Sequence, residues 1–503
     1  MNQVTKIFGP PGTGKTTTLL NLLEEALEEG TPPERVAYVT FTTKARREAV
    51  SRTVERFGFT EEQMPFFRTL HSIAYRELEV SGPMMIHHGE LREFSELIGM
   101  EMTGPSRATE SGLTMTNGNL RGDRFLTFDH LRRHRGQTIE EGYRGWREDE
   151  DLFITRHFCE TYARWKTDEG LLDFTDLLIN VEGPLPVDVV LVDEAQDLSW
   201  LQWRTLERLA ADAERVYVAG DDDQAIFAWA GAEPEELLTL QGEVEVLGQS
   251  YRVPAAVHEL AGQMVSRIRR RQPKEWKPRD EAGEVRWLMS QENVDYDREG
   301  SYLVLYRNHY LGQAVEARLR SEGVPFGHGQ RPTVGGAWSH PIVLWESLRK
   351  QGRVSPAQLH EVYEAMTVGR GVSLDARARL ERCEREKVDL DTAREELGLL
   401  TDEPWFEALD KIPDDEVSYI RRVVRHHGAK ALTDAPKVFL STIHAAKGGQ
   451  ADHVVLLTDL SRVIQREIQR EPDHERRVFY VGLTRAKETL QLIGFDNPLF
   501  SHH

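Results

Sequence analysis

The segment from Gly9 to Thr16, GPPGTGKT, has a composition and spacing that suit the binding of a polyphosphate. Its glycines let consecutive backbone N–H groups curl around phosphate oxygens at the start of a helix, where the helix dipole favours negative charge. In such a loop the lysine reaches the β- and γ-phosphates and the final hydroxyl holds Mg²⁺. Lys15 and Thr16 occupy these places, so the chain is predicted to bind a nucleoside triphosphate. The residues expected to surround it are Gly9, Pro10, Pro11, Gly12, Thr13, Gly14, Lys15, Thr16 and Thr17.

Two acidic residues suggest that the triphosphate is hydrolysed. Asp193 and Glu194 follow an apolar run that begins at Val187. A buried parallel strand would bring them to its carboxyl end, where ligands bind in α/β sheets. Asp193 is expected to share the Mg²⁺ with Thr16, and Glu194 is expected to polarise the attacking water as a general base.

A third apolar run, from Val216 to Gly220, leads into a polar segment and then two aromatic rings. Gln224 is placed to contact the γ-phosphate and its attacking water. Phe227 and Trp229 follow closely, and either ring alone is more often part of a core. Their position directly after the predicted hydrolysis sensor favours a different interpretation, in which they are platforms for stacked bases.

Two arginines complete the candidate catalytic set. Arg252 follows Tyr251 in SYRVP, and Arg485 lies in VFYVGLTRAKE near the end of the sequence. A motor built from two α/β halves needs cationic groups on both sides of the nucleotide to stabilise transition-state charge. An arginine taken at random is most often a surface residue, so these two are chosen by their surroundings. The predicted catalytic residues are Lys15, Asp193, Glu194, Gln224, Arg252 and Arg485.

Strands followed by helices are expected to hold these residues in place. Val4–Phe8 predicts a strand, and Thr16–Gly30 has the apolar spacing of an amphipathic helix that ends at Gly30. A chain of 503 residues is too long to fold around one hydrophobic core, so two to four domains are expected.

Charge and composition narrow the class of protein. The formal net charge of −20 argues against a protein that coats nucleic acid indiscriminately, but it allows a locally basic groove. The sequence has neither an apolar run of about eighteen residues nor a signal peptide, and its two cysteines form no disulfide framework. We therefore expect a cytoplasmic protein with no membrane partner.

In their order along the chain, these segments resemble the motifs of the UvrD/Rep family of superfamily 1A DNA helicases. The loop Gly9–Thr16, LVDEAQD, GDDDQAIFAWAGA, QSYRVP and VFYVGLTRAKE are similar to its motifs I, II, III, IV and VI. Other segments that resemble family motifs are Val39–Ala45, Arg68–Ala74, Leu171–Leu178, Val304–Asn308 and Ser441–Gly448. Motifs III and VI are highly specific, so a chance match of the whole series is negligible. The chain resembles a compact member, of a kind that suits a phage or a minimal bacterial enzyme.

The resemblance implies an α/β fold with two RecA-like P-loop motor domains, each with a parallel sheet and a mainly helical inserted subdomain. ATP would bind in the cleft between the motors. The first motor is expected to comprise residues 1–75 and 167–256, and its DNA-binding insertion residues 76–166. The second is expected to comprise residues 257–330 and 436–503, with a compact insertion at 331–435.

The resemblance also assigns roles to single residues. Tyr251 would stack on the adenine, and Lys447 would couple the nucleotide to DNA. The residues expected to face single-stranded DNA are Phe41, Thr42, His71, Phe227, Trp229, Thr442 and His444. Without the motif context, an isolated histidine such as His71 or His444 is usually a surface residue or a satisfied polar group.

Three positions depart from the family pattern. The family carries an adenine-reading glutamine well upstream of motif I, whereas here Gln3 lies at the first strand itself. Gln450 stands where the family often has a ribose-binding glutamate, and a neutral amide holds a hydroxyl more weakly. Ala230 replaces a basic residue after Trp229, which removes one expected phosphate contact.

The function implied by the resemblance is that of an ATP- and Mg²⁺-dependent translocase and helicase that moves 3′→5′ on single-stranded DNA. Its partners would be single-stranded DNA and junctions of single- and double-stranded DNA, and it would act as a monomer or weak dimer. Two alternatives stay open. One is a translocase that displaces proteins from DNA with little unwinding, and the other is an ATP-gated DNA clamp or loading factor.

Overall fold

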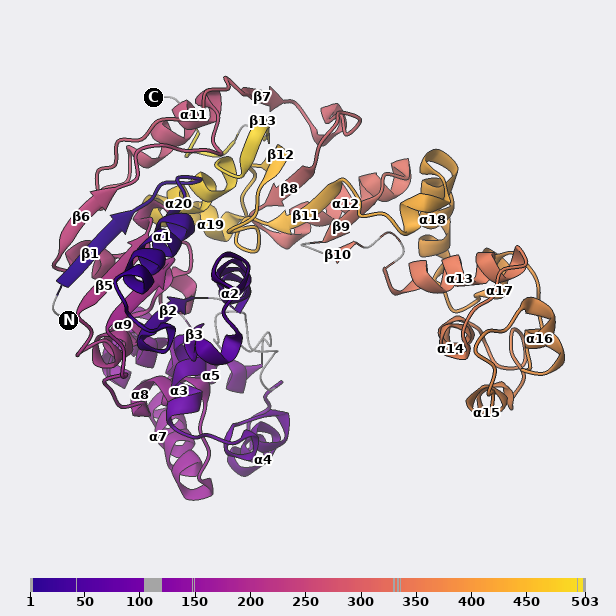
Figure 1. Cartoon of the computed structure of the whole chain (residues 1–503), viewed down its shortest axis with the longest axis horizontal. Coiled ribbons are helices and arrows are strands. Elements are labelled where there is room, and N and C mark those ends of the chain that lie inside the picture. The colour runs from indigo at the N-terminus through magenta and orange to yellow at the C-terminus, as the bar shows by residue number, and fades with distance from the viewer. Residues whose placement is uncertain are drawn as a thin grey trace. The chain divides into compact units, whose positions relative to one another are not determined.

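The computed structural model describes residues 3–41, 43–103, 120–146, 148, 150–328, 331–332, 334, 336–494 and 496–500. The chain divides into two compact units, each of which contains one β-sheet (Figure 1). The first unit comprises Met1–Ala282 with Glu467–Thr484, and the second comprises Gly283–Arg466 with Arg485–His503.

The sheet of the first unit has six strands in the order β3-β2-β4-β5-β1-β6, and every neighbouring pair is parallel. Its carboxyl ends therefore lie along one edge, where the loops that follow β1, β4 and β5 meet. The strands are β1 (Gln3–Phe8), β2 (Val36–Thr40), β3 (Phe66–Thr69), β4 (Val189–Asp193), β5 (Arg215–Gly220) and β6 (Glu243–Val246).

Both faces of this sheet are buried. Phe8, Val39 and Val190 belong to one apolar cluster, and their chain neighbours Ile7 and Tyr38 belong to the other. Because side chains alternate between faces along a strand, a strand buried on both sides is a continuous apolar run. The helices of this unit outside its inserted segment are α1 (Lys15–Glu28), α2 (Thr43–Phe57), α3 (Leu70–Glu77), α8 (Phe174–Asn180), α9 (Trp200–Leu209), α10 (Pro234–Thr239), α11 (Ala255–Val265) and α20 (Pro472–Leu483).

A helical segment with its own aromatic core lies between α3 and α8 in the sequence. Phe94 packs against Phe158 and Trp165, with ring centroids 5.7 and 4.8 Å away. The longest of its helices begins where Asp151 accepts backbone N–H groups and ends at Gly170, whose φ is +66°. The helices are α4 (His88–Ile98), α5 (Arg121–His134), α6 (Ile139–Gly145) and α7 (Leu152–Glu169).

The sheet of the second unit has the order β10-β9-β11-β8-β12-β13-β7. Six of its strands are parallel, and the short β10 is antiparallel to β9. The strands are β7 (Glu284–Leu288), β8 (Tyr302–Tyr306), β9 (Phe326–His328), β10 (Arg331–Pro332), β11 (Val438–Thr442), β12 (Ala451–Leu457) and β13 (Ala486–Ile493), and the adjoining helices are α12 (His309–Glu322) and α19 (Arg462–Arg470).

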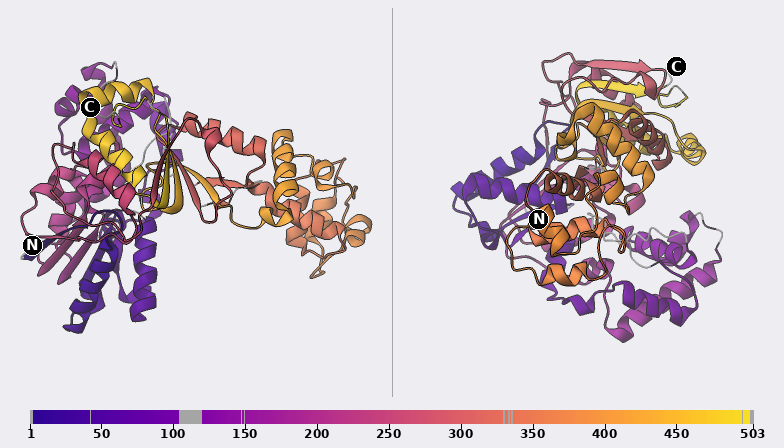
Figure 2. Two further views of the ribbon diagram at one scale, coloured as in Figure 1. Left: turned by 90° about the horizontal axis from the view of Figure 1, so that it is seen from above. Right: turned by 90° about the vertical axis from the view of Figure 1, so that its right-hand side faces the viewer.

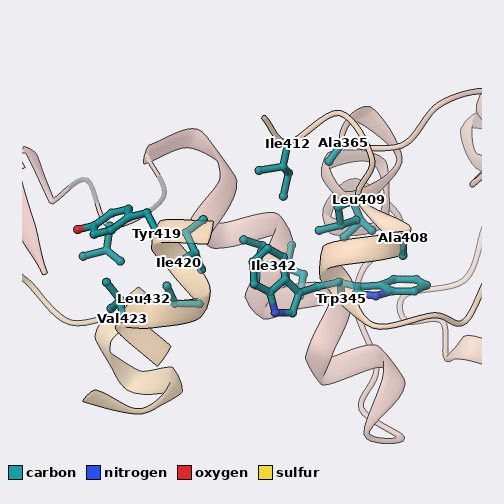
Figure 3. Close-up of a cluster of buried hydrophobic side chains, with 14 of the residues drawn as sticks. Ile342, Trp345, Ala365, Ala408, Leu409, Ile412, Tyr419, Ile420, Val423 and Leu432 are labelled. Carbon is teal, nitrogen blue, oxygen red and sulfur yellow. The ribbon is translucent and has the colours of Figure 1, made fainter. Parts of the chain in front are cut away.

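Between β10 and β11 the chain forms a group of short helices, drawn in orange in Figure 2. Trp345 is fully buried and lies in a cluster of apolar side chains with Ile342 and Leu409 (Figure 3). The Tyr419 hydroxyl donates to the Val324 carbonyl at 3.0 Å and so ties the last helix of the group to the end of α12. These helices are α13 (Ser339–Arg349), α14 (Pro356–Glu364), α15 (Ala376–Glu381), α16 (Leu390–Glu395), α17 (Trp405–Ala408) and α18 (Asp414–His427).

The predicted fold class is confirmed: the protein has an α/β fold with two sheets, each with six parallel strands, and with helices around them. The strand predicted at Val4–Phe8 and the helix predicted at Thr16–Gly30 are present, with ends shifted by one or two residues. Among the described helices, none is both long and apolar enough to cross a membrane. The boundaries of the inserted subdomains stay a prediction.

Candidate nucleotide and DNA sites

The loop between β1 and α1 has the backbone shape that a phosphate cradle needs. Gly12 and Gly14 have φ values of +75° and +87°, which side chains rarely tolerate. A Cβ atom at Gly9 would collide with the Lys15 side chain, and one at Gly12 would collide with Arg252. Gly14 is the N-cap of α1 and makes no side-chain cap bond, so the first backbone N–H groups of the helix face the loop.

Lys15 and Thr16 join this loop to the end of β4. Lys15 Nζ donates to the Gly9 carbonyl at 2.9 Å and lies 3.9 Å from Glu194 Oε1. Thr16 Oγ1 donates to Asp193 Oδ2 at 2.8 Å. The structure therefore brings the predicted phosphate-binding and acidic residues together.

The environment of Asp193 suits a cation. Burial, followed by the nearby Glu194 carboxylate, raises the pKa of Asp193 to about 6, while Lys15 and the Thr16 hydrogen bond act in the opposite direction. Tyr38 adds a hydrogen bond to the same carboxylate at 3.3 Å. A buried carboxylate that is costly to ionise is stabilised by a divalent ion, so Asp193 and Thr16 fit Mg²⁺.

Glu194 has a strained backbone. Its φ of +54° lies in the left-handed region, which is uncommon for a residue other than glycine and occurs often at functional sites. Its side chain is 32% exposed, enough to reach a water molecule. Gln196 Nε2 donates to Glu194 Oε2, and Gln196 Oε1 accepts from the Asp221 N–H at 2.9 Å.

Gln224 is connected to Glu194 through this chain of hydrogen bonds. Gln224 Nε2 donates to Asp221 Oδ2 at 2.8 Å, and the Asp221 backbone is held by Gln196. Gln196 was not among the predicted site residues. Its position two residues after Glu194, inside LVDEAQD, is the feature of the sequence from which a role beside Glu194 could have been predicted.

The segment Ser250–Arg252 packs directly on the phosphate loop. Ser250 Oγ donates to the Pro11 carbonyl at 2.7 Å, and the Tyr251 N–H donates to the Gly12 carbonyl at 2.9 Å. Burial lowers the pKa of Arg252, and its Nε has no hydrogen-bond partner among the described residues. Tyr251 is 74% exposed. The segment thus offers a half-buried cation for an anion and an open ring for a base.

Arg485, Lys447 and Gln450 lie in the second unit. Arg485 is 1% exposed and donates from Nη1 to the Gly449 carbonyl at 3.2 Å, which places it beside the loop that carries Lys447 and Gln450. Gln450 is exposed. Thr442 ends β11 in the same unit, and its hydroxyl accepts from the Ala445 N–H, so His444 lies in a tight turn.

Three of the predicted DNA-facing rings form a row in the first unit. The Phe41 and Phe227 ring centroids are 5.5 Å apart, and the Trp229 ring meets Phe227 edge-on at 5.9 Å. Phe41 is buried, whereas Trp229 is 38% exposed. Thr42 lies outside the described residues. The row gives the exposed indole a rigid support, as a stacking platform requires.

His71 lies in the interior of the first unit. It is 6% exposed, and its ring lies 6.0 Å from Phe174 and 6.5 Å from His134. Burial lowers its pKa to about 4, so the ring is neutral at pH 7. Its role as a DNA contact stays a prediction.

The buried histidines predict that stability depends on pH. Burial lowers the pKa of His71 and of His130 to about 4 and holds that of His134 well below its usual value. In the unfolded chain an imidazole has a pKa near 6.5, so the unfolded state binds more protons between about pH 6.5 and 4. We expect the free energy of unfolding to fall as the pH drops through this window, by about 2 kcal/mol per histidine at pH 5.

Urea unfolding at pH 7 and pH 5 measures this effect. His130→Asn keeps an acceptor or donor near Thr175 but cannot titrate, so the variant should lose less stability on acidification than the parent protein. The exposed His88→Asn should behave like the parent. An identical pH dependence in the His130→Asn variant would contradict the assignment.

Basic side chains of α5 are mostly engaged in ion pairs. Arg121 pairs with Glu150, and the largely buried Arg133 pairs with Asp173 and Asp176. Arg135 Nη2 donates to the Ala228 carbonyl at 3.1 Å, directly between the two aromatic residues of the platform. The basic run at Arg121–Arg135 therefore ties this helix to its neighbours.

Comparisons with known proteins agree with these motifs. The model of the UvrD/REP helicase N-terminal domain matches residues 1–245, and that of the UvrD-like helicase C-terminal domain matches residues 419–497. A probable DNA helicase II homolog of Mycoplasma capricolum is 22% identical over 97% of this chain and 81% of its own length. The ATP-dependent DNA helicase UvrD2 of Mycobacterium tuberculosis is 25% identical over 97% of this chain and 76% of its own length.

Other relatives match over a smaller part. The ATP-dependent DNA helicase Rep of Salmonella typhimurium is 23% identical over 64% of this chain, and the match spans 52% of Rep. The two domain models cover the P-loop, the acidic pair and the final arginine motif in the expected order. The chain belongs to the UvrD/Rep family of superfamily 1 helicases.

Proposed function

We propose that this protein is an ATP-dependent DNA helicase that moves 3′→5′ along single-stranded DNA. Family membership supports ATP-driven work on DNA. The observation that carries the proposal is the phosphate loop itself: the Thr16–Asp193 hydrogen bond, the strained Glu194 and the half-buried Arg252 surround it within one unit. A clamp that only stores nucleotide would not need this set.

Four side chains of the first unit have separate roles in the proposed hydrolysis. Lys15 Nζ leaves the Gly9 carbonyl and binds the β- and γ-phosphates. Glu194 accepts a proton from the attacking water while Gln224 holds that water in line. Arg252 stabilises the charge that develops on the transferred phosphoryl group.

Thr16 and Asp193 are the residues that would hold Mg²⁺. When bound, the ion would neutralise phosphate charge and so support the same displacement. The exposed Tyr251 ring is the proposed adenine platform. From the second unit, Arg485, Lys447 and Gln450 are the proposed nucleotide-contacting residues.

The single strand is proposed to stack on Trp229 and Phe227, with Phe41 behind them. In the second unit, Thr442 and His444 are the proposed contacts. We assign residues 1–75 and 167–256 to the first motor and residues 257–330 and 436–503 to the second. The segments 76–166 and 331–435 are their insertions.

Strand displacement tests this proposal. ATP hydrolysis should rise on addition of single-stranded DNA, and a duplex with a 3′ single-stranded tail should be separated while one with a 5′ tail should not. Lys15→Ala is the matched control: it should show neither DNA-stimulated ATP hydrolysis nor separation of the 3′-tailed duplex. A lack of stimulation by DNA would exclude a motor.

A protein block on the same strand distinguishes the remaining activities. Streptavidin on a biotinylated, unpaired strand measures translocation alone. Removal of streptavidin without separation of the tailed duplex would replace the helicase with a protein-displacing translocase. If DNA stimulates ATP hydrolysis but neither streptavidin removal nor duplex separation occurs, an ATP-gated clamp would be favoured.

A further inference from the structure

A fully buried lysine lies among three consecutive aspartates at the end of β5. Lys274 Nζ is 2.9 Å from Asp221 Oδ1 and 2.9 Å from Asp223 Oδ2, and it also contacts Asp222. The side chains of all four residues are 0% exposed. The three carboxylates are close enough to hold a metal ion, but the lysine ammonium already occupies the point where they meet.

One of the three aspartates that contact Lys274, Asp221, also binds Gln224, the predicted hydrolysis sensor. Asp221 Oδ1 contacts Lys274, while Asp221 Oδ2 accepts from Gln224 at 2.8 Å. The Asp221 N–H donates to Gln196, which in turn donates to Glu194. A shift of Asp221 would therefore reach Gln224 through the carboxylate and Glu194 through the backbone N–H and Gln196.

The other side of this cluster is bound by α20. Arg477 Nε donates to the Asp222 carbonyl at 2.9 Å, and its Nη2 donates to the Arg270 carbonyl at 2.8 Å. Arg271 binds Asp223 through two hydrogen bonds of 2.8 and 2.6 Å. The segment Arg269–Lys274 is thus fixed between the aspartates and the helix that precedes Arg485.

The electrostatics of the cluster depend on the lysine. Burial raises the pKa of Asp222 to about 6 although Lys274 opposes the shift. Burial alone would also raise the pKa of Asp223, but Arg271 and Lys274 hold it below its usual value. Loss of the ammonium group would remove the cation that contacts all three carboxylates, whereas Arg271 would stay bound to Asp223 and Arg477 to the Asp222 carbonyl.

We propose that Lys274 is a positioning residue for ATP hydrolysis: it fixes Asp221, and through it Gln224 and Gln196, at the distance from Glu194 that catalysis requires. This inference rests on the proposed ATPase function. Lys274 is fully buried against the three aspartates and would act only through them, so its loss should lower kcat far more than it changes KM for ATP.

The test must separate positioning from folding, because a buried aspartate cluster without its lysine is unstable. Lys274→Met combined with Asp222→Asn removes one positive and one negative charge, which restores the net charge of the cluster. We expect the double variant to recover most of the thermal stability lost in Lys274→Met. Its DNA-stimulated kcat should nevertheless stay about tenfold or more below the parent, with KM for ATP within about threefold.

A second buried lysine supplies the matched control. Lys166 is paired with Asp173 and Asp176 in the same unit, and among the described residues its ammonium group binds these two carboxylates rather than Asp221 or Gln224. The pair Lys166→Met with Asp176→Asn repeats the chemical change there. Because Asp176 also binds Arg133 of α5, the two double variants are compared by their kcat without DNA, which the Lys166 pair should leave within about twofold and the Lys274 pair should lower about tenfold. The inference would be overturned if the Lys274→Met, Asp222→Asn variant recovered kcat together with its stability. It would also be overturned if the Lys166→Met, Asp176→Asn variant lost as much kcat as the Lys274 pair. Failure of the parent protein to hydrolyse ATP would instead reject the proposed function.

Discussion

Glu194→Gln is expected to reduce DNA-stimulated ATP turnover by about a thousandfold while leaving nucleotide binding nearly intact. The amide has the size of the carboxylate and can still meet Gln196, so the loop geometry is preserved. It cannot accept a proton from water at neutral pH, and a general base contributes roughly 10² to 10⁴ in rate.

Steady-state ATPase assays with and without single-stranded DNA measure kcat, and a fluorescent ATP analogue measures affinity. Glu207→Gln on α9 is the control, because its side chain is exposed to the same extent, 32%, within the same unit. Lys15→Ala should differ from Glu194→Gln by losing nucleotide affinity as well as turnover. A kcat for Glu194→Gln within tenfold of the parent would remove Glu194 from the role of base.

Much of the first unit's fold could be predicted because its signals are local. A parallel strand buried on both faces is a continuous apolar run, and each such run is followed by its functional residues at the carboxyl end. The phosphate loop, Asp193 and Gln224 were found in this way. The short helices α13–α17 carry no comparable motif, since their core depends on Trp345 and Leu409, which meet only in the folded chain (Figure 3).

The predicted site lacked the residues that act through distant contacts. Ser250 braces the phosphate loop across 239 positions of sequence, and Lys274 meets its aspartates across about fifty. Ser250 stands inside QSYRVP, but that motif pointed to Tyr251 and Arg252, and Lys274 stands in none of the quoted motifs. A lysine that follows three arginines in RRRQPKEW suggests a solvated basic surface. Only the folded structure shows that Lys274 is buried and that its charge neutralises buried carboxylates such as that of Asp221.

Sequence reasoning also could not separate exposed arginines from structural ones. The insertion at 76–166 was predicted to bind DNA and contains a basic run from Arg121 to Arg135, but Arg133 of that run is largely buried against Asp129, Asp173 and Asp176. The acids that neutralise it, Asp173 and Asp176, belong to the motif LLDFTDLL. That motif therefore has a physical role in this protein, which is to anchor α5 beside the aromatic platform.

Trp229→Ala is expected to weaken binding of single-stranded DNA by roughly 5- to 150-fold, because each stacked base contributes about 1–3 kcal/mol. ATP hydrolysis without DNA should be nearly unchanged, since the indole is 38% exposed and makes its ring contact with Phe227 rather than with the phosphate loop. Translocation and strand separation should fall with the affinity.

Trp287→Ala is a closely matched control for this substitution. Trp287 is 40% exposed and meets Phe500 edge-on at 5.5 Å, so it has nearly the exposure and ring geometry of Trp229 but no predicted role in DNA binding. Fluorescence anisotropy with a labelled oligonucleotide compares the two variants. An equal loss of affinity in both, or a parallel loss of DNA-independent ATPase in Trp229→Ala, would mean that Trp229 supports the fold. A loss confined to the DNA-dependent steps would mean instead that the rings after Gln224 hold the strand. The hydrolysis sensor and the DNA platform would then be the two ends of one six-residue segment, Gln224–Trp229.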